Sequence, residues 1–279
     1  MSADSNKDPM KPAVARVNEM LDLHGRVALV TGGAGYIGQV FCETLLELGA
    51  EVCILDISTD RAQQLAEELA QRFKIRCTAV TADIAREDQV ASAIARAVAN
   101  HGRLDILVNN AAYPPSKLPE DKRSLEGQSL STWQANLDVM LTGTFLVTRA
   151  CMANLTKSGA GSVINIASIY GLVGPDMHLY EGTEMLNPAF YAVSKGGIVQ
   201  LTRYLATTNA PAVRVNCIAP GGIFRDQPAS FVEKYCARTP LGRMATEEDL
   251  KGTLAFLASD LSKYITGQVI AVDGGWTAW

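Results

Sequence analysis

Tyr191 and Lys195 are two residues whose types and spacing could carry out proton transfer. They are four positions apart in a segment with helical periodicity, so their side chains share one face of the predicted helix. A free phenol has a pKa near 10 and is a poor base at neutral pH, but an adjacent ammonium group stabilises the phenolate. The pair therefore predicts an acid–base group that exchanges a proton with a substrate oxygen.

A glycine-rich loop near the N-terminus predicts a nucleotide site. Gly33, Gly35 and Gly38 form G-x-G-x-x-G between a strand-like run and a helical segment. Glycines allow a diphosphate to approach the backbone closely, and a helix N-terminus offers free N–H groups and a partial positive charge. We expect the dinucleotide to contact the three glycines together with Gly32, Tyr36 and Ile37.

Asp56 indicates which dinucleotide binds. It ends the second apolar run, close to the offset of about 20 residues at which an acid accepts hydrogen bonds from the adenosine ribose. A carboxylate there repels a 2′-phosphate, and neither the glycine loop nor the next residue, Ile57, supplies a cation. Arg61 could offset part of this repulsion. The pattern favours NAD over NADP.

The elements that must position these residues alternate in type. Apolar runs predict about seven strands, and segments of helical period lie between most of them. The strands are expected at 27–31, 52–56, 77–81, 106–109, 163–167, 213–218 and 269–272, and helices at 38–48, 60–73, 88–99, 132–155 and 190–207. Strands that are apolar almost throughout are typical of parallel strands covered on both faces. We expect an α/β protein with a doubly wound parallel sheet, a Rossmann fold, with helices on both faces.

The chain organisation is expected to be simple. Residues 1–22 are polar and predict an N-terminal arm that could include a short helix, and 23–279 predict a single Rossmann-fold domain. Residues 171–188 interrupt the regular order with a loop rich in Gly, Pro and polar residues. Because long loops inside compact domains are often functional, we expect this one to contact substrate.

Composition argues against several classes of function. The net charge of −4 and the absence of a block of like charge argue against nucleic acid or an anionic membrane as the main partner. No apolar stretch is long enough for a signal-peptide core or a membrane span, so a cytoplasmic location is expected. The six scattered cysteines predict buried free thiols. The three histidines are too isolated for a metal site, and no catalytic metal is expected.

Together these residues resemble the short-chain dehydrogenase/reductase family over about residues 23–279. The motifs that carry the resemblance occur in the order expected for that family. They are the glycine loop at 31–38, Asp56, Asp83-Ile84, Asn109-Asn110-Ala111, Asn165-Ile166-Ala167-Ser168, Tyr191 with Lys195, Arg214-Val215-Asn216, Pro220-Gly221 and Val272-Asp273-Gly274-Gly275. The resemblance implies an oxidoreductase that exchanges hydride with a nicotinamide ring.

The resemblance also implies residue roles. Ser168 would hydrogen-bond the substrate oxygen, and Lys195 would hold the nicotinamide ribose as well as assist Tyr191. Further cofactor contacts are expected on the adenosine side from Asp83, Ile84, Asn109 and Ala111, and near the carboxamide from Pro220, Gly221 and Ile223.

Two departures from the family pattern fall near the expected site. Met140 stands where members usually carry a fourth catalytic residue, an Asn, although Asn136 lies one turn earlier on the same face. Arg225 replaces a Thr that contacts the carboxamide. Arg225 and Arg243 could instead meet an anionic group, or each could form a surface salt bridge.

The polar content of 171–188 favours a sugar-like small molecule over a steroid or fatty acyl chain, with His178, Tyr180 and Glu181 as candidate substrate contacts. Short sequence segments in this region and at the C-terminus also resemble those of dehydrogenases linked to flagellin modification and surface-glycan sugar synthesis, and those of gluconate-type reductases. Two alternatives remain. One is a sugar-nucleotide epimerase or dehydratase that retains NAD, because the glycine loop resembles that branch, although few residues follow Lys195. The other is a non-catalytic nucleotide-binding protein.

The predicted helices at 132–155 and 190–207 bear on assembly. Both are apolar over more of their surface than one sheet can cover. By resemblance to the family they pair with symmetry mates, and a homotetramer is expected.

Overall fold

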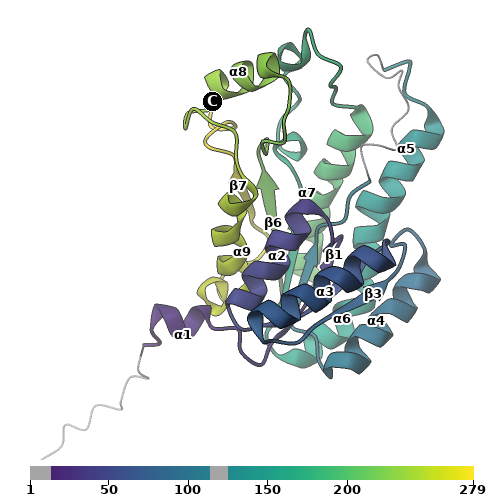
Figure 1. The fold of residues 1–279 in the computed structure, drawn as a ribbon, viewed down its shortest axis with the longest axis vertical. Helices are drawn as coiled ribbons and strands as arrows, with labels where there is room; N and C mark the ends of the chain where they lie inside the picture. The colour runs from purple at the N-terminus through teal and green to yellow at the C-terminus, as the bar shows by residue number, and fades with distance from the viewer. Residues whose placement is uncertain (1–13, 114–124) are drawn as a thin grey trace, which may run out of the picture.

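Seven strands form one parallel sheet in the order β3-β2-β1-β4-β5-β6-β7 (Figure 1). The computed structural model describes residues 14–113 and 125–279. The strands are β1 (Val27–Thr31), β2 (Glu51–Asp56), β3 (Cys77–Thr81), β4 (Ile106–Asn109), β5 (Gly161–Ile166), β6 (Val213–Pro220) and β7 (Val269–Val272). The predicted α/β class and doubly wound parallel sheet are confirmed.

The central strands are buried along their whole length, as their continuous apolar runs predict. Their register aligns Thr31 with Asn109 and Asn109 with Asn165 at the carboxyl ends of β1, β4 and β5. A row of polar side chains therefore borders the edge of the sheet at which ligands bind in this class of fold.

Helices cover both faces of the sheet. One apolar core joins the sheet to α2 (Tyr36–Glu47), α3 (Thr59–Phe73) and α9 (Lys251–Ala258). The other core joins it to α4 (Glu87–His101), α6 (Thr144–Ser158) and α7 (Ala189–Asn209). Figure 1 shows α2, α3 and α9 together on the near side.

The single helix predicted at 132–155 is interrupted. It consists of α5 (Leu130–Leu137), a π-helical segment η2 (Asp138–Gly143), and α6. A Cβ atom on Gly143 would lie 2.8 Å from the Ile84 side chain, so this segment packs tightly against the β3–α4 connection. The widened turn contains Met140, and π-helical turns frequently lie at functional sites.

A further group of elements lies beyond the carboxyl end of the sheet. It contains the short helices η3 (Ile169–Gly171) and η4 (Met177–Tyr180) together with α8 (Ala229–Arg238), which Figure 1 shows at the top. Aromatic side chains of these segments form a separate apolar cluster with Trp276. The helices predicted from the sequence include neither α8 nor α9.

The remaining short elements are α1 (Val17–Leu21), η5 (Glu247–Leu250) and η6 (Asp260–Ser262). Most of the predicted N-terminal arm, residues 1–13, lies outside the described part of the chain. Among the described helices, none has the length and apolar character needed to cross a membrane.

Candidate active site

The first turns of α7 carry Tyr191 and Lys195. The Lys195 Nζ atom lies 5.7 Å from the centroid of the Tyr191 ring. Gly171 packs against the backbone of α7, since a Cβ there would lie 2.7 Å from the Lys195 carbonyl. This close approach brings the end of β5 beside α7, so that Ser168 and Tyr191 face the same cavity.

Burial sets the electrostatics of this group. Lys195 is buried, and its ammonium donates to the Ile166 carbonyl at 2.9 Å. Burial lowers the pKa of Lys195 to about 8. Burial also raises the pKa of Tyr191, and the hydrogen bond with Ser168 partly opposes that rise. The phenol is therefore protonated at neutral pH unless further positive charge lies near it.

Ser168, Tyr191 and Lys195 line one cavity of about 470 Å³. Asn136 and Met140 line it as well, so both residues at the departure from the family pattern face the candidate site. Besides Tyr191 and Lys195, four further predicted cofactor residues border the same cavity: Ile37, Pro220, Gly221 and Ile223.

The glycine loop forms a cradle that side chains would fill. Gly32 has a φ of +60°, and a Cβ there would lie 2.8 Å from the Ala111 Cα. A Cβ on Gly38 would collide with the Gly32 carbonyl oxygen. Gly35 caps α2 without a side-chain acceptor for the first N–H groups of the helix. These features fit the diphosphate of a dinucleotide, which needs free N–H groups and a close backbone.

Asp56 is held at the rim of this cradle. Its carboxylate accepts hydrogen bonds from the Ala34 N–H at 3.1 Å and the Ser58 N–H at 3.0 Å. The Arg61 guanidinium donates to the Ala34 carbonyl at 2.6 Å, so a carboxylate and a guanidinium both border the glycine loop. The next residue, Ile57, is exposed.

Three other predicted cofactor residues, Asn109, Asp83 and Ile84, lie outside the cavity. The Asn109 amide donates to Asn165 at 2.8 Å and to Thr148 at 2.9 Å, and is buried. Asp83 accepts a hydrogen bond from the Ala85 N–H within its own turn. Ile84 is buried beneath the π-helical segment. None of these side chains lines the 470 Å³ cavity.

The structure brings only one of the three predicted substrate residues to the cavity. Tyr180 lines it and is buried. His178 and Glu181 are exposed and pair with each other at 2.8 Å, while Lys234 donates to the backbone carbonyls of both. Since η4 turns these two side chains outward, the polar side chains of the loop do not all face the site.

Several residues that line the cavity were not predicted from the sequence. Among them are Tyr170, Phe231, Tyr235 and Met244. These four residues come from segments far apart in the chain, and only the position of Tyr170, two residues after Ser168, gave a signal.

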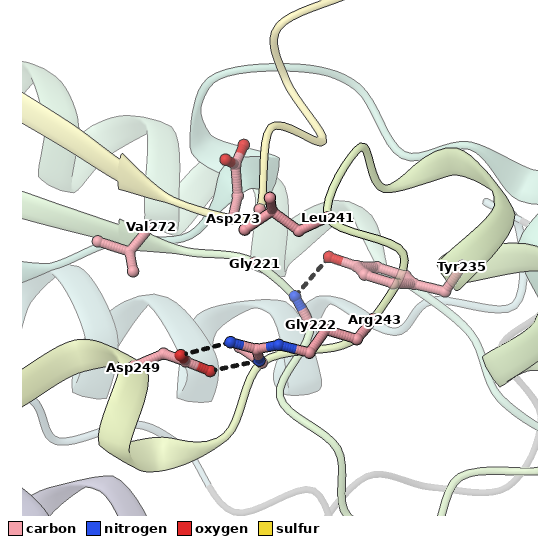
Figure 2. A pocket seen from close by; sticks show the side chains of 10 residues that line it. Gly221, Gly222, Tyr235, Leu241, Arg243, Asp249, Val272 and Asp273 are labelled. Carbon is pink, nitrogen blue, oxygen red and sulfur yellow. Dashed lines mark hydrogen bonds and ion pairs between the residues drawn. The ribbon is translucent and has the colours of Figure 1, made fainter.

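A second, smaller cavity of about 120 Å³ lies beside the ends of β6 and β7 (Figure 2). The Tyr235 hydroxyl accepts a hydrogen bond from the Gly222 N–H there. Arg243 forms two hydrogen bonds of 2.7 Å with Asp249. Arg243 was expected either to bind an anionic group or to form a surface salt bridge, and the structure favours the salt bridge.

Two expectations concern groups outside the cavity. All six cysteines are free, and burial raises the pKa of Cys42, Cys53, Cys77, Cys151 and Cys217. Across residues 14–113 and 125–279, no three His, Cys, Asp or Glu side chains gather in a way that could hold a metal ion.

The chain is similar to known oxidoreductases over nearly its whole length. A family model described as enoyl-(acyl carrier protein) reductase matches residues 32–277. Cis-4-hydroxycyclohexanecarboxylate dehydrogenase from Sinomonas cyclohexanicum is 35% identical over 258 residues, covering 91% of this chain and 97% of the relative.

Post-translational flagellin modification protein A from Campylobacter coli is 33% identical over 258 residues, covering 91% and 99% of the two chains. A gluconate 5-dehydrogenase from Burkholderia cenocepacia J2315, solved with NADP and tartrate, has a TM-score of 0.83 at 31% identity and covers 95% of this chain and 100% of its own.

Proposed function

The chain belongs to the short-chain dehydrogenase/reductase family, and from this premise we propose that it uses NAD to interconvert a secondary alcohol and a ketone on a small, polar, sugar-like substrate. That it is an oxidoreductase of alcohol and ketone groups follows from the family itself. The observation that carries the proposal is the convergence of Ser168, Tyr191 and Lys195 on one cavity.

The residues have complementary tasks. A substrate hydroxyl placed beside Ser168 and Tyr191 accepts a hydrogen bond from the serine and gives its proton to the tyrosine oxygen. The form of Tyr191 that accepts this proton is the phenolate, and the Lys195 ammonium stabilises it through its charge, which the buried setting screens little. A bound nicotinamide supplies the hydride acceptor in this direction and the donor in the reverse one. For ketone reduction, Tyr191 returns the proton to the carbonyl oxygen.

Asp56 supports NAD as the cofactor. Its carboxylate is fixed by two backbone N–H groups at the end of β2, where the adenosine ribose binds in this fold. A fixed carboxylate favours ribose hydroxyls and repels a 2′-phosphate. Arg61 opposes this preference in part, and the similar gluconate 5-dehydrogenase was solved with NADP. Cofactor choice is therefore a direct test of the proposal.

The aromatic side chains that line the cavity support a hydroxylated ring as the substrate. The Tyr180 hydroxyl donates to the Tyr170 hydroxyl at 3.0 Å, and the Asn187 amide donates to Tyr180 at 3.4 Å. All three residues line the cavity together with Phe231. Burial raises the pKa of Tyr170, which keeps that phenol protonated. Aromatic faces accommodate the C–H face of a ring, and hydroxyl and amide tips pair with ring hydroxyls.

A substrate screen tests the function. NADH formation is measured with cis- and trans-4-hydroxycyclohexanecarboxylate, gluconate, cyclic polyols and sugar nucleotides, using Ser168→Ala as the inactive control. We expect turnover with at least one hydroxylated ring, and a preference for NAD over NADP. Turnover on none of them, or nucleotide that remains bound through purification and is not exchanged, would contradict the proposal and favour an NAD-retaining epimerase or dehydratase.

We further propose that the enzyme works as a homotetramer in the cytoplasm. Free cysteine thiols support a reducing compartment. Exposed apolar side chains on α6 and α7 support assembly through these helices.

A further inference from the structure

Arg225 and Tyr36 join the two sides of the cofactor cleft. Tyr36 is the first residue of α2 and is 74% exposed. Arg225 follows β6, and its guanidinium carbon lies 4.6 Å from the centroid of the Tyr36 ring. Arg225 also lines the catalytic cavity beside Ile37, which places it next to the N-terminus of α2.

The position of Arg225 is fixed by its own segment. Asp226 has a φ of +55°, which turns the chain back after Arg225. The Gln227 amide accepts from the Arg225 N–H at 2.7 Å and donates to the Ile223 carbonyl at 2.8 Å. The Phe224 N–H donates to the Ala245 carbonyl, which ties the turn to the neighbouring segment.

A hydrogen bond also fixes the orientation of the Arg225 guanidinium. Its Nε–H donates to Glu247 at 3.1 Å. Within the described part of the chain, no acceptor is found for its two Nη groups. An arginine held through Nε and stacked on a ring presents its remaining donors as a fork, which suits the bidentate geometry of phosphate oxygens.

The N-terminus of α2, which lies beside Arg225, also favours the binding of an anion. α2 begins at Tyr36 with Gly35 as a cap that lacks a side-chain acceptor, so its first N–H groups and its partial positive charge point outward. The Glu247 carboxylate offsets part of the Arg225 charge, but it contacts the Nε side only.

We propose that Arg225 binds the diphosphate of the dinucleotide and that Tyr36 holds the guanidinium over it, so that the pair closes across the bound cofactor. The proposal concerns a binding role that the family resemblance does not give, because there the residue at this position contacts the carboxamide. It rests on the proposed dinucleotide cofactor and does not depend on the substrate.

Binding measurements test the proposal without turnover. Dissociation constants are measured by calorimetry for NADH, for ADP-ribose, which has the diphosphate but no nicotinamide, and for adenosine, which has neither. We expect Arg225→Gln to weaken NADH and ADP-ribose alike by about tenfold and to leave adenosine within twofold. Arg225→Lys should recover part of the loss, since it keeps the charge without the fork.

Two further variants sharpen the test. Tyr36→Leu should weaken NADH and ADP-ribose by a few-fold and speed NADH release in stopped-flow fluorescence, because the guanidinium loses its support. Arg243→Gln is the control, since that arginine pairs with Asp249 and does not line the 470 Å³ cavity, and it should change none of the three constants. Thermal unfolding of each variant verifies the fold.

Three results would overturn the proposal. Arg225→Gln could weaken NADH but not ADP-ribose, which would assign the arginine to the nicotinamide end. It could change only the KM of the substrate, which would assign it to the substrate. It could also change nothing. An enzyme that binds ADP-ribose through Arg225 but forms no NADH with any alcohol would contradict the proposed function and leave this inference standing.

Discussion

The Lys195 ammonium lies one helical turn beyond Tyr191, 5.7 Å from the centroid of its ring, and donates to the Ile166 carbonyl at the end of β5. The contact links α7 to the sheet through a charged group that is almost fully buried. Burying the Lys195 ammonium beside the Tyr191 phenol therefore lowers the free energy of unfolding, and the size of this effect depends on pH.

Replacing Lys195 by Met should reveal that effect. Burial lowers the pKa of Lys195 to about 8, whereas an unfolded lysine titrates near 10.4. Between these values the unfolded chain binds a proton that the folded protein does not, so the free energy of unfolding rises with pH. Relative to Lys195→Met, the wild-type protein without cofactor should gain about 3 kcal/mol at most between pH 8 and 10.

Urea denaturation of both proteins across this range measures the difference. A difference that stays flat or falls with increasing pH would show that Lys195 is not held with a lowered pKa.

Replacing Tyr191 by Phe should reduce kcat to less than a tenth of the wild-type value, because only the proton-transfer group is lost. The NADH dissociation constant should stay within a few-fold. Tyr264→Phe, at a fully exposed tyrosine, is the matched control and should keep full activity. Retention of more than a tenth of the activity on the true substrate would rule out Tyr191 as the acid–base group.

Replacing Asp56 by Ser should weaken NAD about ten- to a hundredfold and improve NADP relative to NAD, because charge-assisted hydrogen bonds contribute about 1.5 to 3 kcal/mol. Asp56→Asn keeps an acceptor for the Ala34 N–H and separates loss of charge from loss of loop geometry. The measurement is kcat/KM with each cofactor. A wild-type enzyme that prefers NADP contradicts the prediction at once.

Replacing Tyr180 by Phe should lower kcat/KM for the hydroxylated substrate by about five- to a hundredfold, because its hydroxyl links Tyr170 and Asn187 on the cavity wall. The NAD dissociation constant should not change. Glu181→Ala is a control in the same loop, at an exposed side chain. If Glu181→Ala is the more harmful variant, the loop must rearrange around the substrate.

The homotetramer can be tested by light scattering at micromolar concentration. Phe145 on α6 and Tyr204 on α7 are large apolar residues that remain exposed, and burying them in an interface would remove that surface from water. Phe145→Lys and Tyr204→Lys should each give smaller assemblies, whereas Tyr264→Lys should not. A monomeric wild-type protein would refute the prediction.

The strands and the candidate catalytic pair could be predicted from the sequence because both are local patterns. A buried parallel strand is a short apolar run, and a helical pair such as Tyr191 and Lys195 is defined by spacing alone. Strand ends fell within a few residues of the observed ones, for example 163–167 against Gly161–Ile166.

Features that depend on packing could not be read in this way. The π-helical turn at Asp138–Gly143 differs from an α-helix only in its hydrogen bonding. The direction in which His178 and Glu181 point depends on the bonds that Lys234 makes to the loop backbone from α8. The stacking of Arg225 on Tyr36 brings together two residues that are far apart in the sequence.

The aromatic cluster beyond the sheet has a consequence for how the enzyme can change. Tyr170, Phe231 and Trp276 belong to a cluster that is separate from the two cores that hold the sheet and helices. Substitutions in this cluster are therefore expected to reshape this wall of the cavity while the glycine loop keeps its own packing. We expect substrate selectivity and cofactor binding to be separable design targets, with libraries aimed at new substrates placed in the segments around η3, η4 and α8.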